Sequence, residues 1–127
     1  MLRRMALTED IITSRYAITG YEDDSVTINE SIYQASLVLS AETLHTPWTS
    51  KTIDTLDEGC LAVILDLEPD VVLLGTGKRQ TFPSAKIFAL FGEKGIGLEV
   101  MDNGALCRTF NILVAEDRAV VAAILFD

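Results

Sequence analysis

The chain has 127 residues, of which 49% are hydrophobic, and its mean hydropathy of +0.30 predicts a well-filled core in one domain (residues 1–127). Its 19 acidic residues outweigh 10 basic ones, and the net charge of −9 argues against a protein that binds nucleic acid or anionic lipid over a wide surface. No apolar run approaches the roughly 20 residues of a membrane-spanning helix. The opening MLRRMALTED is too poor in apolar residues for a signal peptide, so we expect a cytoplasmic protein.

The first part of the chain, about residues 15–40, has the alternating pattern of β-strands. Apolar or small residues alternate with polar ones over 16–20 and again over 26–28, and a turn cluster occupies 22–25 between them. This arrangement predicts an N-terminal β-hairpin. The run 32–39, which holds Tyr33, Leu37 and Leu39, predicts a third strand.

From about residue 52 to 126 the pattern changes to alternating helices and strands. Thr55 and Glu58 have the spacing of a capping box, which predicts that a helix begins there. The all-apolar run Val71–Leu74 that follows is typical of a strand buried on both faces.

A second helix is expected to begin at Pro83 and to end near Gly92, because proline suits the first helical turn and glycine the end of a helix. A strand at 98–100 follows, and then a third helix for which either Asp102 or Asn103 can provide the N-cap. The buried stripe of this third helix consists of Leu106, Phe110 and Leu113.

This order of elements predicts the fold class. An α-β-α-β-α-β series requires parallel strands joined by right-handed helical crossovers. Helices must cover the sheet, because its strands carry almost no polar side chains. We therefore predict a layered α/β domain with an additional N-terminal hairpin.

The segment GTGKRQ, residues 75–80, follows the predicted buried strand and has two interpretations. It does not match the Walker pattern, because Arg79 stands where serine or threonine is required, nor the dinucleotide pattern, because Gln80 stands at the third glycine. It can form a nest of backbone amides that binds an anion beside Lys78 or Arg79. It can equally be a strand-to-helix turn with solvated charges.

The topology favours a crevice at this position. Ligands of open α/β sheets bind at the carboxyl ends of parallel strands. If the strands at 71–74 and 98–100 are parallel, the bends that follow them meet at one rim, and the third helix directs its N-terminal amides there. The residues of this candidate ligand or partner crevice are Gly75, Thr76, Gly77, Lys78, Met101, Asp102, Arg108 and Asn111.

Arg108 and Asn111 share a face of the third helix, and two explanations stay open for them. Arg108 can bind an anion while Asn111 orients a ligand. Alternatively, Arg108 pairs with an acid such as Asp102 or Glu99, and Asn111 satisfies backbone groups.

Residues for catalysis are sparse. His45 is the single histidine, and Cys107 is the plausible thiol nucleophile it would serve. Both Cys107 and Cys60 stand in apolar stretches, which predicts reduced, buried thiols. The acidic residues lack the spacing of a calcium loop. We therefore assign no catalytic residue and expect neither a metal nor a cofactor.

Two stretches, DVVLLGTGKRQTFP and GIGLEVMDNGALCRTFNILVAEDRAVVAAIL, resemble a family of small proteins that includes a mitochondrial assembly factor of respiratory complex I and an adipogenesis-associated protein. The resemblance extends from Pro69 to Leu125 and includes, more loosely, Pro47-Trp48. The signature positions of the family in this chain are Gly75, Thr76, Gly77, Glu99, Met101, Asp102, Arg108, Thr109, Asn111, Glu116 and Arg118. Where the family usually has threonine after Met-Asp, this chain has Asn103.

The resemblance implies a three-layer α/β domain around a mixed sheet with one antiparallel strand. It also implies a protein without established enzyme activity, which acts as an accessory or assembly protein through contacts with other proteins. Since no mitochondrial presequence is evident, we expect a bacterial member with unknown protein partners. A small-molecule or anion-binding protein is the alternative, and a homodimer through an exposed strand edge is a further possibility.

Overall fold

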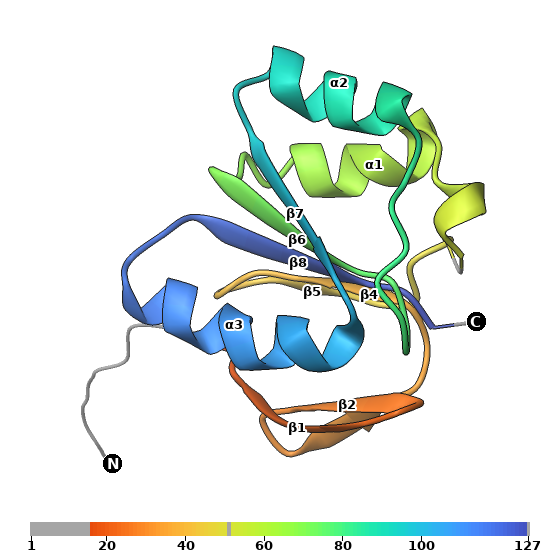
Figure 1. Ribbon diagram of the computed structural model, residues 1–127. Helices are drawn as coiled ribbons and strands as arrows, with labels where there is room; N and C mark the ends of the chain where they lie inside the picture. The colour runs from red at the N-terminus through yellow and green to blue at the C-terminus, as the bar shows by residue number, and fades with distance from the viewer. Residues whose placement is uncertain (1–15, 51, 127) are drawn as a thin grey trace.

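A five-stranded mixed sheet forms the centre of the molecule (Figure 1). The structure is a computed structural model that describes residues 16–50 and 52–126. The strands, in the spatial order β5-β4-β8-β6-β7, are β5 (Leu44–His45), β4 (Leu37–Leu39), β8 (Val120–Ile124), β6 (Val71–Gly75) and β7 (Gly97–Met101). β8, β6 and β7 are parallel, and β4 is antiparallel to both of its neighbours. The predicted α/β class with a mainly parallel, mixed sheet is confirmed.

Helices cover both faces of this sheet (Figure 1). α1 (Glu58–Leu65) and α2 (Ala85–Glu93) lie on one face, and α3 (Asn103–Ala115) lies on the other. Because side chains alternate along a strand, Val72 and Leu74 of β6 join the core beneath α1 and α2, whereas Val71 and Leu73 join the core beneath α3. All five residues of β6 are buried, as expected of a strand covered on both sides.

A second, antiparallel sheet lies on the far side of α3 (Figure 1). Its strands are β1 (Ile18–Glu22), β2 (Ser25–Ile28) and β3 (Ser31–Tyr33). The predicted hairpin is therefore present as β1 and β2. Val26 and Ile28 pack in the same core cluster as Leu106 and Phe110 of α3, so α3 is held between the two sheets.

The apolar run 32–39 forms two strands rather than the single strand that we predicted. β3 pairs with β2 in the small sheet, whereas β4 pairs with β8 in the central one. The chain passes between the sheets near Ser36, which is buried and whose hydroxyl accepts from the backbone N–H of Phe126 at 2.9 Å and donates to its carbonyl at 3.1 Å. A run of apolar residues cannot show which of two sheets each half will join.

The predicted start of the first helix was wrong. Asp57, not Thr55, is the N-cap of α1, and its Oδ1 accepts from the backbone N–H of Cys60 at 2.9 Å. The Thr55 hydroxyl instead donates to the carbonyl of Thr52, within a short 3₁₀ turn, Ile53–Thr55. Thr55 and Asp57 both have side chains that can cap a helix, and the Asp57 carboxylate is the one at the start of α1.

The second helix also differs at both ends. Ser84 is the N-cap of α2, so Pro83 lies just outside the helix, and Gly92 lies within its last turn. The chain leaves the helix at Gly95, whose φ of +72° is a conformation that glycine adopts without strain.

The cap of α1 leads to a prediction about pH. The hydrogen bond from the Cys60 backbone lowers the pKa of Asp57 below its ordinary value of 3.8. A carboxyl with a lowered folded-state pKa contributes its stability above 3.8 and loses it as the pH falls through the folded-state pKa. We therefore expect Asp57→Ala to be less stable than the wild type at neutral pH, and the two unfolding curves to converge in acid. A difference that persists unchanged in strong acid would show that the carboxylate is not responsible.

Candidate functional site

The bends that follow β6 and β7 meet at one rim, as the topology predicted. Gly75 lies opposite Met101 in the parallel register. The backbone N–H of Thr76 donates to the carbonyl of Met101 at 3.0 Å, and that of Asn103 donates to the carbonyl of Gly77 at 2.8 Å. The Met101 side chain packs against the core beneath α3. Two segments that are distant in the sequence, 75–77 and 101–103, thus converge where the parallel strands end.

The side chain of Asn103 fills this rim. It is 6% exposed, and its Oδ1 accepts from the Gly77 N–H at 3.0 Å while its Nδ2 donates to the Leu125 carbonyl at 3.0 Å. The Leu125 N–H in turn donates to the carbonyl of Gly75 at 3.0 Å. We call Asn103, Gly77 and Leu125 the strand-end clasp, because together they join the ends of β6 and β8 to the start of α3.

The close packing of the Asn103 side chain also requires a glycine at position 75. A Cβ atom at this position would overlap Asn103 Oδ1 and would lie 3.0 Å from Leu106 Cδ1. Gly77 is needed for a different reason, since its φ of +96° is rarely adopted by residues with a side chain. The glycine pair therefore allows close packing and a sharp turn.

Three backbone amides of the predicted anion nest, those of Thr76, Gly77 and Asn103, are engaged within the chain. Besides the three amides already described, the N–H of Ala105 donates to Asp102 Oδ1 at 2.8 Å, which makes Asp102 the N-cap of α3. The N–H of Thr81 donates to the hydroxyl of Thr76 at 3.0 Å, and that hydroxyl donates to the Arg79 carbonyl. An anion at this rim would have to displace these bonds, so the geometry favours the interpretation as a structural turn.

Arg108 and Asn111 attach the small sheet to α3. Asn111 forms a pair of bonds with the backbone of Ile18: its Oδ1 accepts from the N–H at 3.0 Å and its Nδ2 donates to the carbonyl at 2.7 Å. Arg108 Nη1 donates to the hydroxyl of Tyr21 at 2.6 Å, and its guanidinium carbon lies 6.0 Å from the centre of that ring. The expectation that Asn111 satisfies backbone groups is confirmed.

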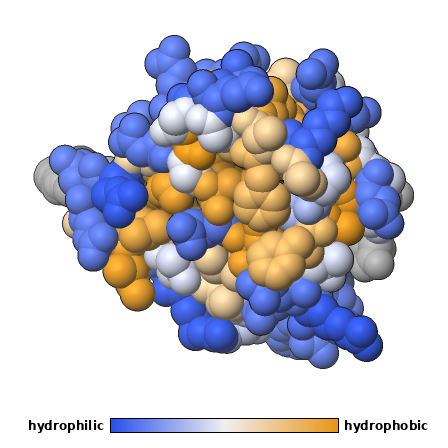
Figure 2. Space-filling model, turned by 45° about the horizontal axis from the view of Figure 1, so that its top comes forward, coloured by the Kyte–Doolittle hydropathy of each residue, from blue (hydrophilic) through white to orange (hydrophobic). Residues whose placement is uncertain are grey.

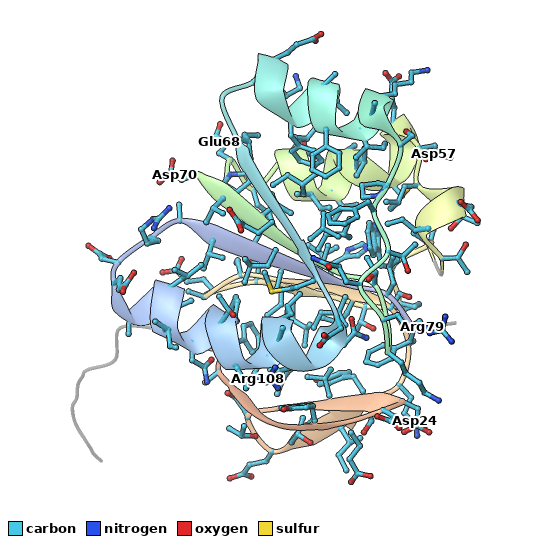
Figure 3. The ribbon with its side chains drawn as sticks, viewed as in Figure 1. Asp24, Asp57, Glu68, Asp70, Arg79 and Arg108 are labelled. Carbon is cyan, nitrogen blue, oxygen red and sulfur yellow. The ribbon has the colours of Figure 1, made fainter. Side chains whose placement is uncertain are left out.

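The alternative that paired Arg108 with Asp102 or Glu99 was wrong. The Asp102 carboxylate is engaged in its own helix cap, and Tyr21 of β1 lies across the first turn of α3. Figure 3 shows the Arg108 side chain between α3 and the small sheet. Sequence reasoning did not identify Tyr21, because no local pattern indicates which helix the hairpin will cover.

Lys78 and Arg79 lie outside the clasp, on an open groove of about 670 Å³. Asp23 and Asp24, from the turn between β1 and β2, line the same groove. Figure 3 shows Arg79 and Asp24 on the same side of the molecule, contributed by the loop after β6 and by that turn. This groove is a shallow surface of mixed charge beside the rim.

The two candidate catalytic residues occupy different environments. Cys107 is part of the core beneath α3, whereas His45 is an exposed residue of β5. Both cysteines are free and buried. Within residues 16–50 and 52–126, no three side chains of histidine, cysteine, aspartate or glutamate gather as a metal site would require. The helices of this described part are all too short or too polar to span a membrane.

Burial makes the Cys107 thiol a poor nucleophile. Its desolvation raises its pKa to about 11, an effect that the nearby Arg108 charge only partly opposes. At pH 8 only about a thousandth of the thiol is ionised. We expect native protein treated with iodoacetamide to remain unmodified at Cys107, and protein unfolded in urea to react fully, as mass spectrometry of peptides would show. Rapid labelling of Cys107 in the native state would contradict this description.

Residues 18–125 match the model of one protein family, described as "Protein of unknown function (DUF498/DUF598)". The chain belongs to this family. The match covers the small sheet as well as the region Pro69–Leu125, so the resemblance predicted from the two quoted stretches is confirmed and extends further toward the N-terminus.

Relatives of this DUF498/DUF598 protein have been named in two ways. This chain is 29% identical to the "13 kDa major membrane protein" of Francisella tularensis subsp. holarctica (strain LVS), over 95% of this chain and 99% of the relative. It is 26% identical to "NADH dehydrogenase [ubiquinone] 1 alpha subcomplex assembly factor 3" of Xenopus tropicalis, over 96% of this chain and 74% of the relative. A Xanthomonas campestris protein, solved by NMR as a structural genomics target, has a TM-score of 0.81 and 38% identity, covering 87% of this chain and 84% of its own.

Proposed function

We propose that this protein is a non-enzymatic accessory protein that acts in assembly through contacts with other proteins. The observation that carries the proposal is the strand-end clasp. At the rim where α/β proteins usually bind ligands, the Asn103 side chain accepts from the Gly77 N–H and donates to the Leu125 carbonyl. The relatives named as assembly factors support the same role.

Under this proposal the candidate crevice residues build a platform. Gly75, Thr76, Gly77, Met101 and Asp102 hold the strand ends and the start of α3 in a fixed arrangement. A second group, formed by Arg108 and Asn111, fixes the small sheet on α3. Partners would then meet the outer surface of a rigid body.

Affinity capture from native lysate, followed by mass spectrometry, tests this proposal. We expect the wild-type chain to enrich one or a few proteins reproducibly, compared with an unrelated acidic protein of similar size. We expect Arg108→Ala/Asn111→Ala, which loosens the small sheet, to enrich them less. If no protein is enriched over the acidic control, the accessory role is wrong.

The second candidate function is that of a protein that binds an anion or small molecule. An enzyme that acts on such a ligand belongs to the same candidate function. The open groove beside Lys78 and Arg79 favours it. Thermal unfolding with phosphate, nucleotides and small carboxylates separates the two functions. The accessory role predicts an unchanged melting temperature, whereas a saturable rise that disappears in Lys78→Ala/Arg79→Ala would establish the second function.

We also propose a cytoplasmic location, because both Cys60 and Cys107 are free thiols, as is usual in reducing compartments. A homodimer through the outer edge of β3 is a further candidate arrangement, since within residues 16–50 and 52–126 β3 pairs with β2 alone. Light scattering distinguishes monomer from dimer.

A further inference from the structure

Asn103 and Gly104 form the single Asn-Gly pair of the chain. In a flexible polypeptide such a pair is reactive, because the backbone nitrogen of the glycine attacks the side-chain carbonyl carbon, Cγ, of the asparagine. A bond forms between that nitrogen and Cγ, ammonia leaves, and water opens the resulting succinimide ring to aspartate or isoaspartate. Glycine favours the reaction, since it has no side chain to hinder its nitrogen. The residue that closes the rim is therefore also the asparagine with the most reactive neighbour.

The native position of Asn103 opposes this reaction. Asn103 is the first residue of α3, and closure of the succinimide ring needs a backbone conformation at this residue that is not helical. Its side chain is held at the oxygen by the Gly77 N–H and at the nitrogen by the Leu125 carbonyl, both at 3.0 Å. The residue is 6% exposed, so water reaches it poorly. Both Cγ and the leaving nitrogen are thus fixed by the strand-end clasp.

Gly104 is closely packed on its outer side. A Cβ atom there would lie 3.2 Å from Tyr21 Cε2 and 3.3 Å from both Arg108 Nη1 and Asp102 Oδ1. The first turn of α3 must therefore unwind before the Gly104 nitrogen can bond to Cγ. The reaction proceeds from an opened state of the chain, and its rate follows the population of that state.

Deamidation would break the strand-end clasp. Replacing Nδ2 by oxygen removes the donor to the Leu125 carbonyl and places a carboxylate oxygen beside it. A buried charge that lacks a matching donor is costly, and the positive end of the α3 dipole offsets only part of that cost. Isoaspartate also lengthens the backbone by one carbon at the first residue of α3. Neither product can rebuild the native set of hydrogen bonds.

We propose that Asn103-Gly104 is a deamidation site that the native clasp protects and that unfolding exposes. Each opening of the chain lets the pair react, and a reacted chain cannot restore the clasp. Deamidation thus turns a reversible opening into an irreversible one. The native surface already carries an apolar patch bordered by hydrophilic residues (Figure 2), so a chain with a loosened core is expected to self-associate. This proposal is independent of the accessory function.

Incubation in mildly alkaline buffer, with and without urea, tests the site by mass spectrometry of peptides. We expect the Asn103 peptide to show the exchange of NH₂ for OH in urea, and to show it at least about a hundredfold more slowly in native buffer. Asn29 and Asn111 are internal controls, because residues with larger side chains follow them. Both should stay largely unmodified in urea over the same time.

Gly75→Ala tests whether the clasp is the protecting element. The new methyl group would overlap Asn103 Oδ1, so we expect deamidation in native buffer to be faster than in the wild type. The matched control is Gly92→Ala, which has nothing within 4 Å of the added Cβ and should not accelerate the reaction. Equal rates in the two variants would show that the clasp does not protect the pair.

Refolding of the deamidated chain tests the consequence. We expect it to unfold at a lower urea concentration than the unreacted chain and to scatter more light. Asn103→Asp should be destabilised in the same way at neutral pH, and less so in mild acid, because a protonated carboxyl can donate to the Leu125 carbonyl. An unchanged urea midpoint of the deamidated chain would overturn the proposal. So would deamidation in native buffer at the rate seen in urea, or equal conversion of Asn103 and Asn111 in urea.

Discussion

Replacing Asn103 with alanine is expected to lower the free energy of unfolding by about 2–5 kcal/mol, as measured by urea denaturation. The substitution removes one acceptor and one donor from a side chain that is 6% exposed. The Gly77 N–H and the Leu125 carbonyl then lose their partners in a place that water reaches poorly. Each buried polar group left without a partner costs about 1–3 kcal/mol.

The control for this prediction is Gln80→Ala. Gln80 also makes a side-chain bond to the backbone, from Nε2 to the Val100 carbonyl at 2.9 Å, but it is exposed, so water can replace the bond. We expect a loss below about 1 kcal/mol. Equal losses in Asn103→Ala and Gln80→Ala would mean that the clasp contributes no more than a surface contact.

Replacing Gly75 with alanine is expected to cost about 1–3 kcal/mol, because the new methyl group has no space between Asn103 Oδ1 and Leu106 Cδ1. The loss should be smaller when Asn103 is already alanine, since the overlapping oxygen is gone. A double-mutant cycle of Gly75→Ala and Asn103→Ala is therefore expected to show a coupling of about 0.5–3 kcal/mol. Additive effects would contradict the close approach that the structure shows.

Gly92→Ala is the matched control for Gly75→Ala. Gly92 lies in α2 with nothing within 4 Å of an added Cβ, and its φ is not positive. Alanine is the better helix former by about 0.8–1 kcal/mol, so this substitution should increase stability. The opposite signs of the two glycine substitutions separate close packing from a general effect of adding a methyl group.

Much of the fold could be predicted from local patterns. The all-apolar run at Val71–Leu74 and the stripe containing Leu106 and Phe110 each show a periodicity that belongs to one element, and each element is present. The division of 32–39 into β3 and β4 could not be predicted. Both halves are apolar and extended, and only the tertiary position of β8 and β2 decides which sheet each half joins.

The position of the candidate site could be predicted from the sequence, but the side chains that fill it could not. Parallel strands must end at one edge, so the meeting of the bends near Thr76 and Asp102 follows from the order of elements. The inward direction of the Asn103 side chain does not follow from the order of elements. At the first position of a helix, the surrounding strands decide where the side chain points. Likewise, the bond between Arg108 and Tyr21 joins residues that only the docking of the small sheet brings together.

The Asn103 side chain closes the rim at the ends of β6, β7 and β8. Hydrogen exchange at the Gly77 amide, followed by NMR, tests this most directly. The bond to Asn103 Oδ1 predicts that this amide exchanges at least about a hundredfold more slowly than the amide of exposed Lys78, and that phosphate leaves the rate unchanged. If the Gly77 amide exchanged as fast as that of Lys78, or if phosphate slowed it saturably, the rim would be an open binding site.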